Sequence, residues 1–191
     1  MIGLVGRLDP VKGHSTFITA ATLLADERKD VRFVCVGEGP QTYRIQLERL
    51  SQELGLTECL IWAGARKDMP AVYNALDIVC SPSYSEAFPN IVAEAMACGV
   101  PCVVTDVGDT AKIVGDEGIM VSPGDPHMLA KGLKTMLQGL HEINPHHLRE
   151  RIVRRFSVET MIEATERILI ERCGGIPLKQ TDGEKSVKLQ Q

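Results

Sequence analysis

The stretch DIVCSPSYSEAFPNIVAEAMACGVPCVVT, residues 77–105, contains the pattern that decides the fold. Its apolar runs at 78–81 and 101–105 are typical of buried strands. Between them, Pro89 suits the first position of a helix that runs to Cys98 and is closed by Gly99. A strand, a helix and a second strand in this order predict a βαβ unit with parallel strands.

The same alternation continues on both sides of this stretch. Further strands are predicted at residues 2–6, 31–37, 59–63 and 118–121, mostly separated by helical stretches of about 10 to 15 residues. The runs VRFVCVG, LIWAG and DIVCS are almost continuously apolar, so these strands are expected to be buried on both faces. Two more helices are predicted at 125–140 and 158–172. The predicted fold class is therefore α/β, a Rossmann-like parallel sheet with helices on both faces.

Length and composition indicate one globular domain. The chain has 191 residues, of which 44% are hydrophobic and 24% are charged, enough to bury a core. Periodicity stops near residue 172, so 1–172 are expected to form the domain and 173–191 a loose tail. Uncharged stretches such as 95–105 are far shorter than the roughly 20 residues that span a bilayer, and no signal peptide is visible.

Charge and cysteine content narrow the function classes. The 21 basic and 25 acidic residues give a formal net charge of −4, and the scattered basic residues argue against a nucleic-acid partner. The six cysteines lie mostly in apolar runs without a C-x-x-C pair, which favours reduced thiols and a cytoplasmic location. Cysteines and histidines have no zinc-site spacing, so no metal site is expected.

Ligands of such sheets bind at the carboxyl ends of the strands, so the loops there hold the candidate site residues. After the first strand, Gly6 is followed by Arg7, and Lys12 lies just before the next helix. The two cations are well placed for a phosphate, which free amides at a helix N-terminus also favour. Spacing alone leaves open that both are ordinary solvated loop cations.

The loop that leads into the helix of the opening stretch holds a second group of candidates. Phe88, Asn90 and Ile91 offer amides near the positive end of the helix dipole. Glu94 shares a helix face with Asn90 and Ile91, about 6 Å further along the axis, and Glu86 precedes the helix. Carboxylates repel phosphate but accept hydrogen bonds from the hydroxyls of ribose or a sugar. Taken singly, each glutamate also fits a surface position without a ligand.

A third loop, VGEGPQT at residues 36–42, partly imitates the dinucleotide fingerprint G-x-G-x-x-G. Thr42 stands where the third glycine would be, so the pattern is weak evidence for a nicotinamide cofactor. Gly37 and Gly39 either let a ligand approach the backbone or form a tight turn.

Together these motifs resemble the C-terminal half of a retaining glycosyltransferase of the GT-B fold, family 4. The resemblance covers about residues 2–172: GR-x4-KG after the first strand, the GEG turn, the string 62–109 and GIMVSPGDPHMLAKGL at 118–133. Its most specific element is E-x7-E, which Glu86 and Glu94 provide within SEAFPNIVAEAMACGVP.

The resemblance implies a nucleoside diphosphate sugar as donor and transfer of its sugar with retention. Arg7 and Lys12 would neutralise the diphosphate and Glu86 would face the sugar hydroxyls, which makes these three the expected catalytic residues. Glu94 would hold the ribose hydroxyls. The expected donor-binding set is Gly6, Gly37, Arg66 at the base edge, Phe88, Asn90, Ile91 and Glu94. No metal or other cofactor is expected, because Arg and Lys take its place.

The resemblance also implies a missing partner. In this family an N-terminal Rossmann-like domain binds the acceptor, and no such domain lies in this chain, so the chain alone is expected to be inactive. Membrane contact is expected only through that missing domain. Lys112 stands where the family commonly has Glu, which affects the loop after the strand at 101–105.

Other functions remain open from sequence. One is a stand-alone nucleotide-sugar binding module without transferase activity, and others are a GT-B sugar-nucleotide epimerase and a nicotinamide dehydrogenase. The E-x7-E context argues against the epimerase, and the missing third glycine argues against the dehydrogenase. The donor's base and sugar and the acceptor cannot be inferred from the sequence.

Overall fold

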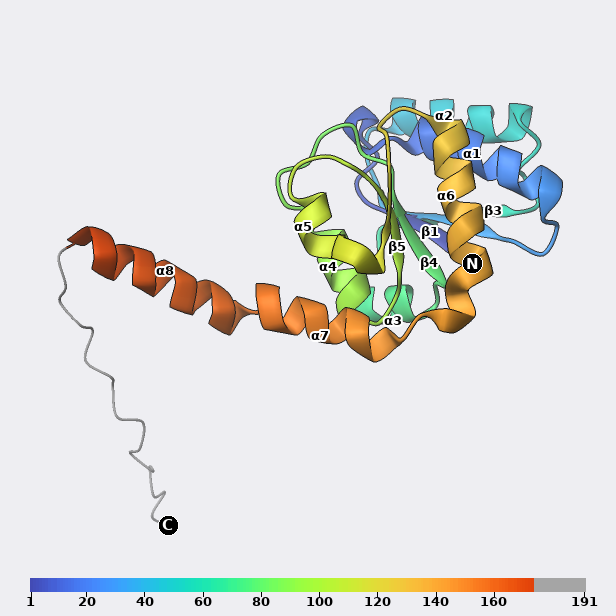
Figure 1. Ribbon diagram of the computed structural model, residues 1–191. Helices are drawn as coiled ribbons and strands as arrows, with labels where there is room; N and C mark the ends of the chain where they lie inside the picture. The colour runs from blue at the N-terminus through green and yellow to red at the C-terminus, as the bar shows by residue number, and fades with distance from the viewer. Residues whose placement is uncertain (174–191) are drawn as a thin grey trace, which may run out of the picture. The chain divides into compact units, whose positions relative to one another are not determined.

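The computed structural model describes residues 1–173, and the predicted tail lies beyond this range except for Cys173. Residues 1–155 form one compact unit around a six-stranded parallel sheet (Figure 1). Its strands, in the spatial order β3-β2-β1-β4-β5-β6, are β1 (Ile2–Val5), β2 (Phe33–Val36), β3 (Leu60–Gly64), β4 (Ile78–Ser81), β5 (Cys102–Thr105) and β6 (Ile119–Val121). The predicted parallel α/β fold is confirmed, and each predicted strand is present to within two residues.

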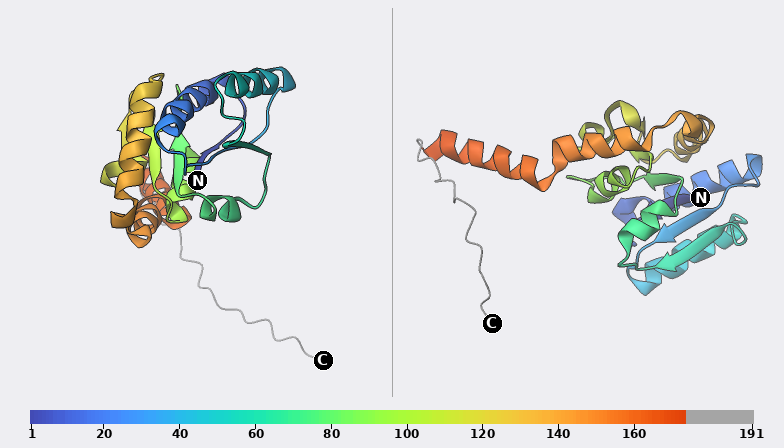
Figure 2. Two further views of the ribbon diagram at one scale, coloured as in Figure 1. Left: turned by 90° about the vertical axis from the view of Figure 1, so that its right-hand side faces the viewer. Right: turned by 90° about the horizontal axis from the view of Figure 1, so that it is seen from below.

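Helices cover both faces of the sheet, as Figures 1 and 2 show. One face carries α1 (His14–Glu27), α2 (Gln41–Glu53) and α6 (Pro126–Gly139), and the other carries α3 (Met69–Asn74), α4 (Asn90–Ala97) and α5 (Thr110–Val114). Short 3₁₀ turns lie at Pro10–Lys12, Gly115–Glu117 and Leu140–Glu142. The chain continues through α7 (Pro145–Phe156), while α8 (Val158–Cys173) belongs to a second unit.

The main core lies between the sheet and the first helix layer. Alternate strand residues such as Ile2, Phe33 and Ile78 are completely buried there, together with Phe17 of α1. The rings of Phe17 and Phe33 pack edge to face with centroids 6.0 Å apart. Apolar runs of four residues suffice because each inner strand has a helix layer on both faces.

Two expectations about the second face of the sheet are wrong. LIWAG is not buried on both faces: Ile61 in β3 is 49% exposed. This strand is the edge of the sheet, and its second face borders a hollow of about 240 Å³ beside α3 rather than a packed helix. The helices α3 and α5 have 6 and 5 residues, shorter than the roughly 10 to 15 expected.

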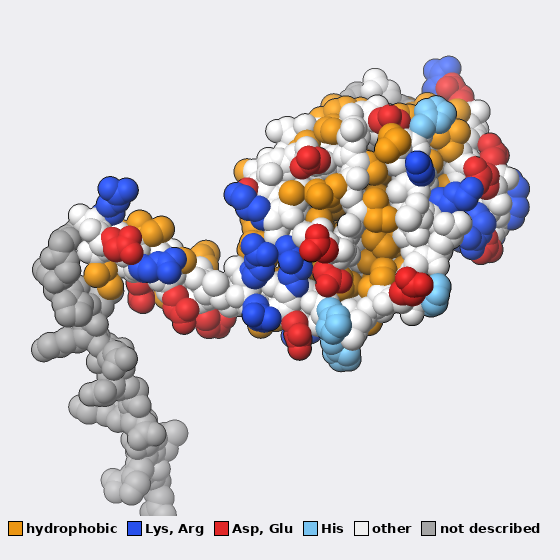
Figure 3. Space-filling view, viewed as in Figure 1, with side chains coloured by type: hydrophobic (Ala, Val, Ile, Leu, Met, Phe, Trp, Pro, Cys, Tyr) orange, Lys and Arg blue, Asp and Glu red, His pale blue; other side chains and the backbone are white. Residues whose placement is uncertain are grey.

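The helix α7 was not predicted. Two of its arginines donate hydrogen bonds to the helices of the second face. Arg149 donates to the carbonyl of Ala97 at 2.7 Å, and Arg151 donates to those of Ile113 and Lys112 at 2.6 and 2.9 Å. These carbonyls end α4 and α5, where the helix dipole favours a cation. Basic side chains gather over α7 in Figure 3, and two of the arginines of this helix thus have a structural role.

Two further findings concern the core and the membrane. The described thiols of Cys35, Cys59, Cys80, Cys98 and Cys102 form no disulfide. Burial raises the pKa of the Cys35, Cys80 and Cys102 thiols, so these behave as small apolar core groups.

Within residues 1–173, no helix combines the length and apolar character needed to cross a bilayer.

Candidate functional site

The order of the strands places a topological switch point at the carboxyl end of the sheet, where open α/β sheets have their ligand-binding crevice. The strand β1 lies between β2 and β4, and the chain leaves β1 toward the α1 layer but leaves β4 toward the α4 layer. In open α/β sheets, ligands bind between loops that depart to opposite faces in this way. The loops after β1 and β4 carry the predicted residues Arg7, Lys12 and Glu86.

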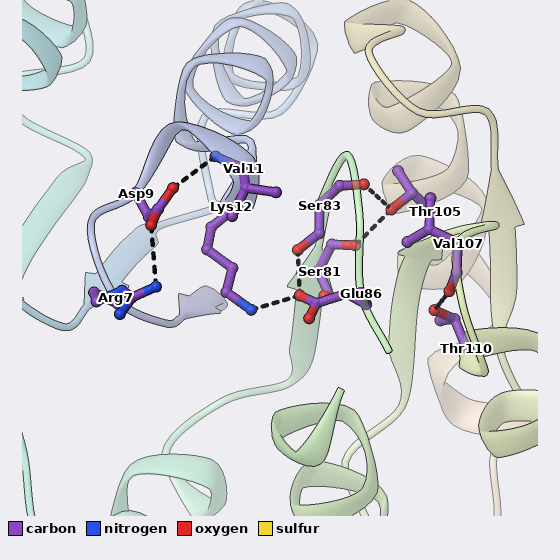
Figure 4. Close-up of polar contacts among 10 residues, drawn as sticks. All are labelled: Arg7, Asp9, Val11, Lys12, Ser81, Ser83, Glu86, Thr105, Val107 and Thr110. Carbon is purple, nitrogen blue, oxygen red and sulfur yellow. Dashed lines mark hydrogen bonds and ion pairs between the residues drawn. The ribbon is translucent and has the colours of Figure 1, made fainter. Parts of the chain in front are cut away.

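Lys12 and Glu86 meet at this crevice. Lys12 Nζ lies 2.6 Å from Glu86 Oε1, although the residues are 74 positions apart in sequence (Figure 4). The side chains are only 25% and 11% exposed, so the charges are partly removed from water and interact more strongly than a surface pair. The buried Ser83 donates from Oγ to the same Glu86 oxygen at 2.7 Å. Glu86 Oε1 therefore has two donors in this structure.

The local sequence builds the turn that carries Lys12. Asp9 Oδ1 accepts from the Val11 amide at 3.0 Å and caps the 3₁₀ turn. Gly13 has φ +69° and starts α1, and a Cβ at this position would lie 2.1 Å from the Pro82 carbonyl oxygen. Only glycine permits both this backbone and this approach. The β1 and β4 loops are thereby packed against each other.

The loop that carries Glu86 is held from its other side by β5 and the loop that follows it. Thr105 Oγ1 donates to the carbonyls of Ser83 and Ser81 at 2.6 and 3.3 Å (Figure 4). The Asp109 amide donates to the Ala87 carbonyl at 2.9 Å. Ser83 and Thr105 were not predicted as site residues, and the only local signal in the sequence was their position at strand ends. Lys112 pairs with Asp109 at 2.7 Å and points largely to solvent.

Arg7 is not joined to the Lys12–Glu86 pair. Its guanidinium donates to Asp9 Oδ2 at 3.1 Å and the side chain is mostly exposed (Figure 4). Since Asp9 already neutralises much of its charge, Arg7 is the weaker of the two candidate phosphate ligands in this conformation.

The second group of candidates lies at the start of α4. The helix begins at Asn90, with Pro89 as the N-cap instead of the expected first helical residue, and no side chain caps it. The first-turn amides of a helix have no partner within the helix, and Asn90 and Ile91 are the first two residues of α4, directly after the loop that carries Phe88. Glu94 follows one turn later, and its Oε2 accepts from the Tyr73 hydroxyl at 2.7 Å.

The remaining predicted residues lie after β1, β2 and β3. A Cβ on Gly37, which has φ +145°, would lie 1.9 Å from the Gly6 carbonyl oxygen, and one on Gly39 would lie 2.2 Å from that of Leu8. The two glycines thus allow close packing of chain on chain, which favours the tight-turn interpretation over ligand approach. Arg66 forms a two-bond pair with Asp68 at 2.9 and 2.7 Å on the surface.

His14, the first residue of α1, gives the unit a pH-dependent stability. Burial of the imidazole lowers the pKa of His14 to about 4, while the backbone and carboxylate of Asp9 oppose this shift. Between about pH 6.5 and 4, the unfolded chain therefore binds a proton that the folded chain does not. As the pH falls through this range, the free energy of unfolding should decrease by up to about 1.4 kcal/mol per pH unit.

Urea unfolding of the wild type and of His14→Gln at pH 7 and 4.5 measures this effect. The His14→Gln variant should lose a smaller part of its stability on acidification, whereas the same change at the exposed His127 should not alter the pH dependence. Equal pH dependence in all three proteins would show that the His14 proton has no part in it.

Comparison with known proteins identifies the family of this chain. The model of the group 1 glycosyl transferases matches residues 1–139. The 2-deoxystreptamine glucosyltransferase of Streptomyces kanamyceticus is 35% identical over 141 residues, which cover 72% of this chain and 36% of that protein. The D-inositol 3-phosphate glycosyltransferase of Corynebacterium jeikeium is 32% identical over 188 residues, covering 90% and 43%.

This chain also resembles solved structures. The crystal structure of Anabaena Alr3699/HepE in complex with UDP-glucose superposes with a TM-score of 0.81 at 27% identity, covering 89% of this chain and 48% of that one. The chain thus spans less than half the length of each of these three proteins.

Proposed function

The chain belongs to the group 1 glycosyl transferases, and we propose that it is the donor-binding domain of a retaining glycosyltransferase that uses a nucleoside diphosphate sugar. The observation that carries the proposal is the Lys12–Glu86 pair at the crevice between β1 and β4, beside the uncapped start of α4. A cation, free amides and two carboxylates match a ligand with both a diphosphate and several hydroxyls.

The roles of the residues follow from this chemistry. The diphosphate lies against the amides of the first turn of α4 and against Lys12, whose ammonium group has three donors and binds phosphate oxygens while it pairs with Glu86. Arg7 adds to this charge when its guanidinium leaves Asp9. Glu86 accepts hydrogen bonds from the donor sugar, and Glu94 accepts them from the ribose. The most strongly stabilised species is the leaving diphosphate, where negative charge grows as the sugar departs.

Transfer with retention needs no side-chain nucleophile. The bond between the anomeric carbon and the diphosphate oxygen breaks, and the acceptor hydroxyl oxygen bonds to that carbon on the same face. The hydroxyl proton passes to the departing diphosphate. With Lys12 and Arg7 supplying positive charge, the reaction is proposed to proceed without a metal ion.

The donor base is proposed to be uracil, because Alr3699/HepE was solved with UDP-glucose. The acceptor is proposed to bind to a further domain, because the chain covers only 36% and 43% of the two glycosyltransferase relatives. The enzyme is proposed to act in the cytoplasm, with any membrane contact made by that further domain.

Ligand-dependent thermal unfolding tests the proposal. UDP, GDP, ADP and their common sugar conjugates are added separately to the chain. A ligand at 100 times its Kd stabilises the folded state by about 2.7 kcal/mol, or about 5 to 10 °C in Tm for this size. We expect such a shift with UDP and UDP-sugars. No shift with any of these nucleotides would contradict the proposal for this chain.

Glu94→Ala checks that the shift comes from this site. The variant should weaken UDP binding by about 1 to 3 kcal/mol, because the ribose hydroxyls lose their hydrogen-bond acceptor. Glu53→Ala is the matched control, since Glu53 lies on the surface of α2 and pairs with Arg49. Unchanged UDP affinity in Glu94→Ala would refute the assignment of Glu94 to the ribose.

A further inference from the structure

We propose that Tyr73 is a positioning residue for ribose recognition, whose hydroxyl holds one oxygen of the Glu94 carboxylate so that the other is directed to the ligand. The inference rests on the proposed function, because it assigns a task to Tyr73 within the same donor site. Tyr73 belongs to α3, outside the E-x7-E segment and 21 residues before Glu94.

The contact joins a buried donor to an exposed acceptor. Tyr73 is 1% exposed, and its hydroxyl donates to Glu94 Oε2 at 2.7 Å, the length of a strong bond to a carboxylate. Glu94 itself is exposed on α4. A buried ring cannot follow a moving side chain, so the hydroxyl fixes where the carboxylate lies.

The charge state of Tyr73 supports a permanent donor. Burial, with the hydrogen bond to Glu94 adding to it, raises the pKa of the Tyr73 phenol. The hydroxyl therefore keeps its proton throughout the neutral range, and the bond to Glu94 does not titrate there.

Glu86, the other glutamate of the site, is also held by hydrogen bonds from the protein. Ser83 and Lys12 both bind Glu86 Oε1, just as Tyr73 binds Glu94 Oε2. In each carboxylate one oxygen is engaged by the protein, and the other is left to accept from a hydroxyl. A glutamate held in advance loses less side-chain freedom on binding than a free one.

A purely structural role is the competing explanation. The hydroxyl of a buried tyrosine needs a partner for its own sake, and Glu94 would then serve only the fold. The two explanations differ in what they predict for a ligand without ribose hydroxyls. A structural role affects all ligands alike, whereas a positioning role affects only ligands that use Glu94.

The experiment measures Kd by calorimetry for UDP and for 2′,3′-dideoxyuridine 5′-diphosphate. The proteins are the wild type, Tyr73→Phe, Glu94→Ala and the double variant, with the GDP and ADP pairs of ligands run alongside. Tyr84→Phe is the matched control, because it removes a hydroxyl that bonds Thr16 rather than a site carboxylate. Thermal unfolding without ligand reports the structural cost of each change.

We expect Tyr73→Phe to weaken UDP binding about three- to tenfold, the equivalent of one hydrogen bond. Binding of the dideoxy nucleotide should stay unchanged, and Tyr73→Phe should have no further effect on the Glu94→Ala background. Tyr84→Phe should leave the preference for UDP over the dideoxy nucleotide intact.

Three outcomes would overturn the inference. An equal loss for both nucleotides in Tyr73→Phe would show a structural role, and no loss for either would show that Glu94 needs no support. Additive losses in the double variant would show that Tyr73 acts independently of Glu94. If the wild type bound no nucleoside diphosphate, the proposed function would fail as well, which separates that result from the other three.

Discussion

Lys12→Ala is expected to weaken UDP binding by about 1.5 to 3 kcal/mol, or roughly 10- to 150-fold, while uridine binding changes little. The variant removes the cation that faces the diphosphate and leaves Glu86, which is 11% exposed, without a charged partner. An unpaired carboxylate beside the phosphate site then repels the ligand, so the loss exceeds that of one neutral hydrogen bond.

Calorimetric titration of the chain with UDP and with uridine measures this difference. Lys29→Ala is the matched control, because Lys29 is highly exposed and faces Asp26 away from the crevice. Arg7→Ala should have a smaller effect than Lys12→Ala, since Arg7 is exposed and already pairs with Asp9. Equal losses for UDP and uridine in Lys12→Ala would mean that Lys12 does not contact the phosphates.

Gly13→Ala is expected to have the largest effect on stability, about 2 to 5 kcal/mol. Two costs add at this position: an alanine at φ +69° is strained, and its Cβ would lie 2.1 Å from the Pro82 carbonyl oxygen. The β1 and β4 loops must separate to admit the methyl group. Because these loops carry Lys12 and Glu86, the variant should also bind UDP more weakly than its stability at the assay temperature accounts for.

Gly55→Ala separates the two costs. Gly55 has φ +76°, nearly the same backbone conformation, but nothing lies within 4 Å of a Cβ there. Its loss should therefore be limited to the strain of the left-handed backbone, about 1 to 2 kcal/mol. Urea unfolding of both variants gives the two free energies. If Gly13→Ala cost no more than Gly55→Ala, the packing of the two loops would not require glycine.

Features that depend on residues close together in the sequence could be predicted. The strands follow from short β-branched runs, and α4 follows from Pro89 and Gly99, to within one residue at each end. These helix bounds place Glu94 on α4 and Glu86 in the loop before it. The wrong predictions concern features that depend on contacts between segments distant in sequence. The strand β3 has an open face because it lies at the edge of the sheet. The helix α7 depends on the contacts of Arg149 and Arg151 with α4 and α5.

By itself, then, the sequence determined the class of the fold, the position of its strands and the residue types at their carboxyl ends, because these depend on local periodicity and turn chemistry. Only the tertiary structure decided which of these residues meet. Lys12 reaches Glu86 because β1 and β4 are neighbours in the sheet, and Tyr73 reaches Glu94 because α3 lies against α4. Adjacency of elements distant in sequence is set by how the whole sheet and its helices bury their apolar faces, and no short stretch of sequence encodes it.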